Sequence, residues 1–406
     1  MVMARIRTTS FGGGKKKSIM EETSVGACMV YSSYSTPMAS FLSGFSQSLS
    51  NLAGAFAKKD GESVFGIDIG TSSIKVVQLV EKKGVAVLET YGEISLGPYA
   101  EAEVGQSVNP PLEKASEALV DLLREANVTA KTGGVSIPLS SSLISVISLP
   151  TRNEEDLATM IPIEARKYIP VPVSEVTLDW FVIPEAEAEF LSAAGSERAK
   201  NATDVLLVAI HNAALERYQS IVSGAKLSPR FFEIEPFSIS RSAYEHSTAP
   251  VMIVDLGASS TRVYIIEFGI VDVSHTISRG SQDITRSLAQ SKNLTFLEAE
   301  KQKRRTGVSE TEAGLSTLEY VFSEAKRIFL TYQRKEGKAV SEMVLVGGGA
   351  SLKGIEDIAK KYFDAPVSIS NPFDKTSAPA FVIDVLKDAG PSFAPAVGLA
   401  LRALKQ

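Results

Sequence analysis

Two stretches of this sequence share one pattern: FGIDIGTSSIKV at residues 65–76 and MIVDLGASSTRV at residues 252–263. In both, an apolar run delivers an aspartate into a glycine turn, two serines follow, and a basic residue opens the next apolar run. Each copy predicts a strand, a tight turn and a returning strand, which a third strand then continues. The copies begin 187 residues apart, a period too long for a solenoid and typical of a duplicated domain.

The residues of the two turns suit a bound phosphate. Glycines let the backbone approach a ligand closely, and the hydroxyl and N–H groups that follow suit phosphate oxygens. These residues are Gly70, Thr71, Ser72, Ser73, Gly257, Ser259 and Ser260. Asp68 and Asp255 repel each other across a pseudo-twofold axis unless a cation lies between them, and Mg²⁺ is often held by one or two carboxylates with nucleotide phosphates. Lys75 is either a phosphate-binding charge or a surface lysine at a strand end.

A third glycine-rich turn supports the same ligand. The apolar strand predicted at residues 342–346 runs into Gly347, Gly348 and Gly349, and a helix is expected from about Leu352. Glycines at a strand-to-helix turn allow a flat base or a phosphate to approach the helix N-terminus. The turn lacks the G-x-G-x-x-G spacing of a dinucleotide fold, so its weight comes from following the two aspartate turns.

Composition excludes several classes of function. The chain has 406 residues, enough for two to four folding units, and a net charge of −5, so the basic surface of a nucleic-acid-binding protein is absent. Its one cysteine, Cys28, excludes an internal disulfide framework, and the three histidines are scattered. No run of about 18 apolar residues occurs, so we expect no transmembrane helix and an intracellular location.

Residues 1–63 differ from the rest of the chain. They are rich in Ser, Gly and Thr, carry excess positive charge and predict a flexible tail. Apolar residues 41, 45, 49, 52 and 56 within them recur at helical spacing. This pattern fits a short amphipathic helix on a membrane or a partner, or a weak helix on its own domain. Further along, Asn153 predicts a helix N-cap, and Pro162 is expected to kink or interrupt that helix.

Together the three turns resemble the two phosphate motifs and the adenosine motif of the actin-like ATPase superfamily. AEKQKRRTG at residues 299–307 is similar to a helix of that superfamily whose Glu and Lys contact the nucleoside, which implies this role for Glu300 and Lys303. GSQDIT at residues 280–285 resembles a G-G-x-x-I-T turn of bacterial members, with Asp283 and Thr285 matching and Ser281 replacing the second glycine.

A closer resemblance is to the PilM family of type IV pilus assembly, relatives of the division protein FtsA. It rests on EARKYIP at residues 164–170 with Glu175, Val176 and Asp179, on FEIEP at 232–236, NPF at 371–373 and PAVGLALR at 395–402. It covers the chain from about residue 64 to the end. The resemblance implies an α/β fold: a duplicated RNase H-like, actin-type ATPase fold with a small α+β insertion in the first half.

The resemblance also implies how the chain is divided. Residues 64–134, 211–250 and the C-terminal helix at 393–406 form the first half, residues 135–210 the insertion, and residues 251–392 the second half. Family members bind the N-terminal cytoplasmic peptide of a membrane partner, PilN, between the insertion and the first half. For this chain we expect that groove near residues 135–149 and 176–183, together with self-assembly into a ring at the cytoplasmic face of the inner membrane.

Three functions are compatible with these patterns. The first is a cytoplasmic scaffold that binds ATP and Mg²⁺ and is at most a slow ATPase, because no convincing general base is present; Glu164 is a candidate by family position alone. The second is a small-molecule kinase on the same fold, which needs an acidic base beside a polar substrate pocket. The third is an FtsA-like division filament protein, for which a C-terminal amphipathic membrane helix is expected.

Overall fold

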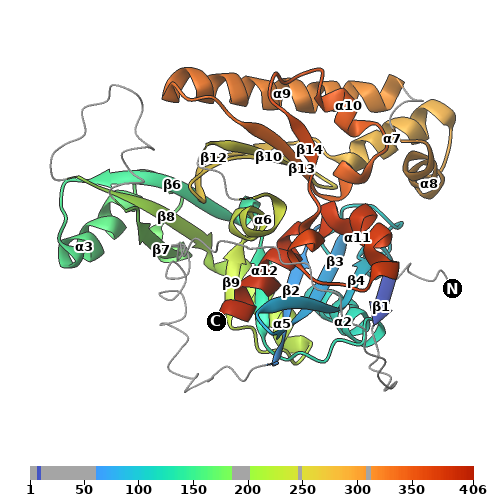
Figure 1. The fold of residues 1–406 in the computed structure, drawn as a ribbon, viewed down its shortest axis with the longest axis horizontal. Helices are drawn as coiled ribbons and strands as arrows, with labels where there is room; N and C mark the ends of the chain where they lie inside the picture. Colours follow the sequence, from blue (N-terminus) through green and yellow to red (C-terminus); the bar gives the residue numbers. More distant parts are fainter. Residues whose placement is uncertain (1–6, 11–60, 185–201, 246–248, 308–311) are drawn as a thin grey trace, which may run out of the picture.

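The computed structural model describes residues 7–10, 61–184, 202–245, 249–307 and 312–406 (Figure 1). Its strands form a six-stranded sheet of order β1-β4-β3-β2-β5-β9, a five-stranded sheet of order β12-β11-β10-β13-β14 and a three-stranded sheet of order β6-β8-β7. In Figure 1 the five-stranded sheet lies above the six-stranded sheet, and the three-stranded sheet projects to one side. Two large sheets and one small sheet therefore organise the described chain.

The six-stranded sheet carries the first aspartate turn. Its strands are β1 (Arg7–Ser10), β2 (Ser63–Ile69), β3 (Ser73–Lys82), β4 (Val85–Ser95), β5 (Gly133–Ile137) and β9 (Phe231–Ile234). One face packs against helices α2 (Leu112–Glu125) and α5 (Asn212–Gly224), and the other against α6 (Glu235–Ala243) and α12 (Ala394–Lys405). Helix α2 packs on the sheet through one apolar stripe, formed by the buried residues 115, 118, 119 and 122.

The five-stranded sheet carries the second aspartate turn. Its strands are β10 (Val251–Leu256), β11 (Thr261–Glu267), β12 (Ile270–Ile277), β13 (Glu342–Val346) and β14 (Val367–Ile369). The helices of this half are α7 (Ser281–Lys292), α8 (Phe296–Thr306), α9 (Glu312–Glu336) and α10 (Ile355–Ala359). Leu386 and Ala389 of α11 (Ile383–Ala389) instead pack in the core with β2, β3 and β4, so the second half ends before the expected residue 392. Helix α9 contributes Phe322, Phe329 and Tyr332 to the core that it forms with the five-stranded sheet.

The two large sheets repeat one topology. In the first, β2 pairs antiparallel with β3, β3 antiparallel with β4, and β2 parallel with β5. In the second, β10, β11, β12 and β13 repeat these three pairings in the same order and direction. A further parallel strand then extends each sheet, β9 beside β5 and β14 beside β13. This repetition confirms the duplicated actin-type α/β fold that the sequence predicts.

The three-stranded sheet joins β6 (Ser142–Leu149), β7 (Val176–Val182) and β8 (Thr203–His211). Helix α3 (Glu154–Ala165) covers one face, and Phe181 from the other face packs against the core of the first half. Residue 135, where the insertion was expected to begin, falls inside β5 of the six-stranded sheet, so the separate sheet begins at Ser142. The Asn153 side chain caps α3, but Pro162 does not interrupt the helix, which continues to Ala165.

Little of the N-terminal segment is described. Residues 7–10 form β1, which pairs antiparallel with β4 at the edge of the six-stranded sheet. This pairing departs from the flexible tail expected for residues 1–63, whereas residues 1–6 and 11–60, with the apolar pattern at 41–56, lie outside the described residues. Within the described ranges, no helix combines the length and the apolar character that crossing a bilayer requires.

The C-terminal helix α12 is bound into the first half by close contacts and buried charge. A Cβ on Gly66 of β2 would collide with the carbonyl oxygen of Ala396, so glycine allows the helix to lie directly on the sheet. Glu233 of β9 is fully buried and pairs with Arg241 of α6 and with Arg402 of α12. Burial opposes ionisation of Glu233, but the two arginines outweigh it and lower its pKa.

We predict that Glu233→Gln strongly destabilises the fold. The substitution leaves the buried Arg402 and the part-buried Arg241 without their counter-charge, which costs about 3–5 kcal/mol in comparable buried pairs. The free energy of unfolding from urea titration followed by circular dichroism is the measurement. Glu216→Gln, at an exposed position of α5, is the matched control and should change it by less than about 0.5 kcal/mol. Equal midpoints for the two variants would contradict the assigned role of Glu233.

Candidate functional site

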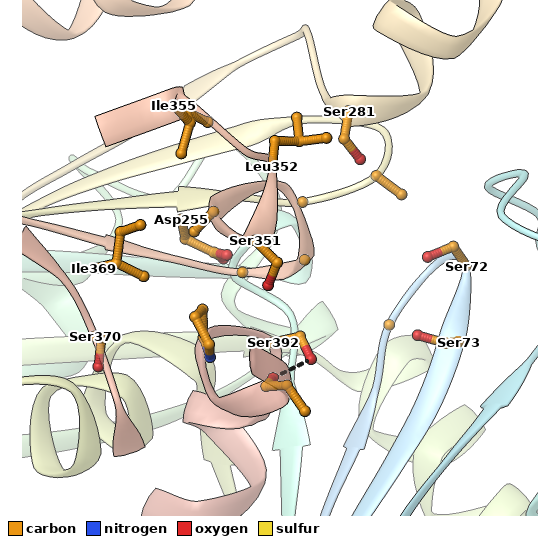
Figure 2. A pocket seen from close by; sticks show the side chains of 18 of the residues that line it. Ser72, Ser73, Asp255, Ser281, Ser351, Leu352, Ile355, Ile369, Ser370 and Ser392 are labelled. Carbon is orange, nitrogen blue, oxygen red and sulfur yellow. Dashed lines mark hydrogen bonds between the residues drawn. The ribbon is translucent and has the colours of Figure 1, made fainter. Parts of the chain in front are cut away.

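A cavity of about 880 Å³ lies between the two large sheets. Every residue predicted for the site lines this cavity except Gly349. The predicted residues that line it are Asp68, Gly70, Thr71, Ser72, Ser73, Lys75, Asp255, Gly257, Ser259, Ser260, Glu300, Lys303, Gly347 and Gly348. Figure 2 shows Ser72 and Ser73 on one side of this space, with Asp255 and Ser351 on the other. Three motifs far apart in sequence therefore meet at one site.

The two aspartate turns face each other across the cavity. The hydroxyl oxygens of Thr71 and Ser259 lie 3.4 Å apart, which places the two turns in contact. The turns also close alike: the N–H of Gly70 donates to the carbonyl of Ser73 at 3.0 Å, and that of Gly257 to the carbonyl of Ser260 at 3.1 Å. The predicted pseudo-twofold arrangement of the turns is thus present.

The two aspartates are buried and have different partners. The hydroxyl of Ser136 donates to Asp68 Oδ1 at 2.6 Å, and Arg262 Nη1 donates to Asp255 Oδ2 at 3.1 Å. Burial raises the pKa of Asp255, Arg262 opposes the rise, and the negative charge of Asp68 adds to it. The two carboxylates therefore interact electrostatically, as the repeat predicts.

Lys75 lies against the first turn rather than at the surface. Its ammonium donates to Ser73 Oγ at 2.8 Å and lies 3.5 Å from Glu93 Oε1, and its side chain is only 11% exposed. Because it also lines the cavity, the alternative of a strand-end surface lysine is wrong. Its positive charge is available to an anion that enters the cavity.

Glu235 and Arg262 are site residues to which sequence reasoning gave no role. Glu235 opens α6 directly after β9; its Oε2 accepts the N–H of Leu139 at 3.2 Å and lies 3.4 Å from Arg262 Nε. Burial raises the pKa of Glu235 to about 7, Arg262 opposes this, and Asp68 and Asp255 push it further upward. The sequence signals were present, because Glu235 lies in the FEIEP stretch and Arg262 aligns with Lys75.

Glu300 and Lys303 on α8 form a buried network. Lys303 Nζ lies 2.6 Å from Glu300 Oε2, which also accepts from Thr285 Oγ1 at 2.7 Å. Arg304 Nε binds the other oxygen, Oε1, at 2.6 Å. Burial opposes ionisation of Glu300, but the two cations outweigh it and lower its pKa. A ligand hydroxyl that binds Glu300 must therefore compete with the half-exposed Arg304.

Asp283 and Glu164, which the resemblance also named, have polar partners within the protein. Asp283 lies in the first turn of α7 and accepts the N–H of Gly280 at 2.9 Å. Glu164 lies on α3, pairs with Lys167 at 2.8 Å, and is not among the residues that line the cavity. Glu164 therefore offers no general base at this site.

The three glycines after β13 differ in how much space surrounds their Cα atoms. Gly347 has φ of +85°, and a Cβ there would collide with Asp255 Oδ1. A Cβ on Gly349 would come within 2.7 Å of the Leu256 Cβ, so this glycine serves packing, whereas Gly348 has open space around it. The helix expected from about Leu352 begins at Ile355, because a short 3₁₀ turn, η6 (Gly348–Ser351), comes first.

The cavity suits a nucleotide with magnesium. Its volume lies in the range of about 300–1,000 Å³ that small-molecule pockets occupy. Among the described residues, no cluster of three or more His, Cys, Asp or Glu side chains could hold a metal by itself. The donor set of two carboxylates and several hydroxyls fits an ion that keeps its waters and binds chiefly through phosphates.

We predict that Gly347→Ala destabilises the fold and Gly348→Ala does not. Alanine at 347 meets both an unfavourable φ and the Asp255 carboxylate, a combination that costs of order 1–3 kcal/mol. Alanine at 348 meets no atom within 4 Å. Thermal unfolding followed by circular dichroism measures both variants, and equal melting temperatures would contradict the close approach of Gly347 to Asp255.

Comparisons with known proteins agree with this fold. The family model of type IV pilus assembly protein PilM matches residues 66–404. A structure described as a PilM-PilN type IV pilus biogenesis complex is similar at a TM-score of 0.71 with 22% identity, over 84% of this chain and 99% of that chain. Ethanolamine utilization protein EutJ from Carboxydothermus hydrogenoformans matches at a TM-score of 0.49 with 15% identity, over 90% and 99%. On its sequence match and its fold, the chain belongs to the PilM family of actin-like pilus assembly proteins.

Proposed function

We propose that this protein is an ATP-binding scaffold of a type IV pilus or related secretion machine. The observation that carries the nucleotide proposal is the contact between Thr71 and Ser259, which brings two copies of one aspartate turn to a single cavity. A ligand with several anionic oxygens can use the hydroxyls and N–H groups of both turns at once. A nucleoside triphosphate with Mg²⁺ meets that requirement.

The residues divide the ligand between them in this proposal. Asp68 and Asp255 hold Mg²⁺ through its waters, and the turn hydroxyls with Lys75 hold the phosphates. Glu300, Lys303 and the backbone at Gly347 and Gly348 hold the nucleoside. The bound metal supplies positive charge that offsets the phosphates and the two carboxylates. Because the cavity is lined by both halves, occupancy biases their closure and, through it, affinity for a partner.

The partner that we propose is the cytoplasmic N-terminal peptide of a membrane protein resembling PilN. The similar PilM-PilN structure supports this choice, and Asp179 on β7 supports the location. β7 is an edge strand, and Asp179 is only 7% exposed. Its Oδ1 accepts the N–H of Trp180, but its Oδ2 has no hydrogen-bond partner. An extended peptide beside β7 would supply the missing donor, and would hold the protein at the cytoplasmic face of the inner membrane.

We predict that Asp255→Asn weakens Mg²⁺-dependent ATP binding by at least about tenfold, because the amide retains the shape but loses the charge that binds a hydrated cation. Isothermal titration calorimetry with ATP and MgCl₂ is the measurement. Asp364→Asn, an exposed position outside the cavity lining, is the matched control and should bind as the unmodified chain does. Unchanged affinity for Asp255→Asn would refute the metal assignment.

We also predict that Asp179→Asn weakens binding of the partner's N-terminal peptide by about tenfold, since it removes a charge-assisted hydrogen bond. Burial raises the pKa of Asp179 to about 6, with Arg402 opposing the rise. Protonation below about pH 6 removes the acceptor charge, so affinity should fall between pH 7.5 and pH 5 in the unmodified chain and stay level in Asp179→Asn. Fluorescence anisotropy of a labelled peptide measures this.

The control for the peptide experiment is Asp156→Asn, an exposed position on α3. It should bind the peptide with unchanged affinity and with the same dependence on pH as the unmodified chain. Absence of peptide binding with ATP, with ADP and without nucleotide would count against the proposed partner.

A further inference from the structure

The guanidinium of Arg262 lies where the cavity concentrates negative charge. Arg262 Nη1 is 3.1 Å from Asp255 Oδ2, and Arg262 Nε is 3.4 Å from Glu235 Oε2. Asp68 contributes a third carboxylate, because its charge raises the pKa of both Asp255 and Glu235. One buried cation therefore bridges two acids that come from different halves of the fold.

The corresponding residue of the first turn behaves differently. In the strand register, Asp68 on β2 lies opposite Lys75 on β3, as Asp255 on β10 lies opposite Arg262 on β11. Lys75 bonds to Ser73 and Glu93, and no ion pair between it and Asp68 occurs in the described structure; Asp68 is held by Ser136. Arg262 therefore neutralises the charge of Asp255, whereas Asp68 is bound, among the described residues, only by the neutral hydroxyl of Ser136.

The planar fork of arginine explains how one side chain can serve two acids. Its Nε and Nη1 donors lie on different sides of the planar group and can bind oxygens of two different acids at once, which a lysine ammonium at the end of a flexible stem does less well. Arg262 is nearly buried, so neither contact is fully screened by solvent. A divalent cation bound at Asp255 would therefore lie close to this guanidinium and be repelled by it.

We propose that Arg262 competes with Mg²⁺ for Asp255, and that Glu235 is the second anchor to which Arg262 is confined when the metal is bound. This inference rests on the nucleotide site proposed above and adds its regulation. Without metal, the Arg262 guanidinium neutralises Asp255 and offers positive charge to the phosphates. With metal, Arg262 must release Asp255 Oδ2 before this oxygen can accept a hydrogen bond from the ion's waters, and Glu235 keeps the displaced charge in place.

The proposal predicts opposite effects for the two partners of the ion pair. Arg262→Gln removes the competitor. The Mg²⁺ concentration that gives half of the maximal gain in nucleotide affinity should therefore fall by about fivefold or more, while binding of metal-free nucleotide weakens. Glu235→Gln removes the second anchor and leaves Arg262 on Asp255 alone, so the same midpoint should rise. A purely structural pair would weaken nucleotide binding in both variants and shift both midpoints in one direction.

The experiment uses the full chain and the ATP analogue adenylyl-imidodiphosphate. Calorimetric affinities are measured across a series of MgCl₂ concentrations and in excess EDTA, for the unmodified chain, Arg262→Gln, Glu235→Gln and the control Arg327→Gln. Arg327 is an exposed residue of α9 whose ion partner is Glu324, so its variant should match the unmodified chain. Circular dichroism of each variant checks folding, and Arg262→Lys, which keeps the charge without the fork, gives the test should Arg262→Gln unfold.

Each outcome decides a separate question. Midpoints that move in opposite directions for Arg262→Gln and Glu235→Gln support the competition. Midpoints that stay level or move together overturn it, even where the nucleotide binds well. Absence of nucleotide binding by the unmodified chain, with metal and in EDTA alike, overturns the proposed nucleotide site and this inference with it.

Discussion

The structure depends on the compensation of like charges that the fold buries together. Duplication of one hairpin brings Asp68 and Asp255 to the same cavity, and Glu235 adds a third acid whose pKa they raise. A buried carboxylate without a partner costs several kcal/mol, so each of the three has a donor within the protein. Ser136 serves Asp68, Arg262 serves Asp255, and Leu139 with Arg262 serves Glu235. These donors fix the relative positions of β2, β5, β10, β11 and α6.

The same compensation ties the C-terminal helix to the cavity. Glu233 is bound by Arg241 and by Arg402 of α12, and Glu235, two residues later, enters the cavity. The charge of Arg402 also acts on Asp179 in the three-stranded sheet. One short segment, β9 and the start of α6, therefore lies between the C-terminal helix and the acids of the site. Gly66 makes this possible, because it lets α12 lie against β2 without a side chain between them.

Sequence reasoning succeeded where a local pattern dictates local geometry. The aspartate turns, the hydroxyl residues after them and the glycine turn after β13 are short-range features, and the internal repeat supplied the long-range pairing of the two turns. It failed where a contact depends on distant segments. The bridge from Arg262 to Glu235 joins β11 to α6, and the packing of Gly349 on Leu256 joins the turn after β13 to the end of β10, so neither contact has a local signature. The insertion boundary failed for a related reason, because β5 reads as an apolar strand whichever sheet it joins.

The divergence of the two copies matches the asymmetry of the nucleotide that we propose as the ligand. A symmetric cleft treats both ends of a triphosphate alike, whereas a nucleotide has a base at one end and a terminal phosphate at the other. Here the second copy is followed by the glycine turn that contacts Asp255 and by the α8 network of Glu300 and Lys303, and the first copy has neither. The difference between Lys75, which binds Ser73 and Glu93, and Arg262, which binds Asp255 and Glu235, extends this asymmetry to the charges. Duplication therefore supplied the opposed turns, and substitution at the residue facing each aspartate gave them different electrostatic properties.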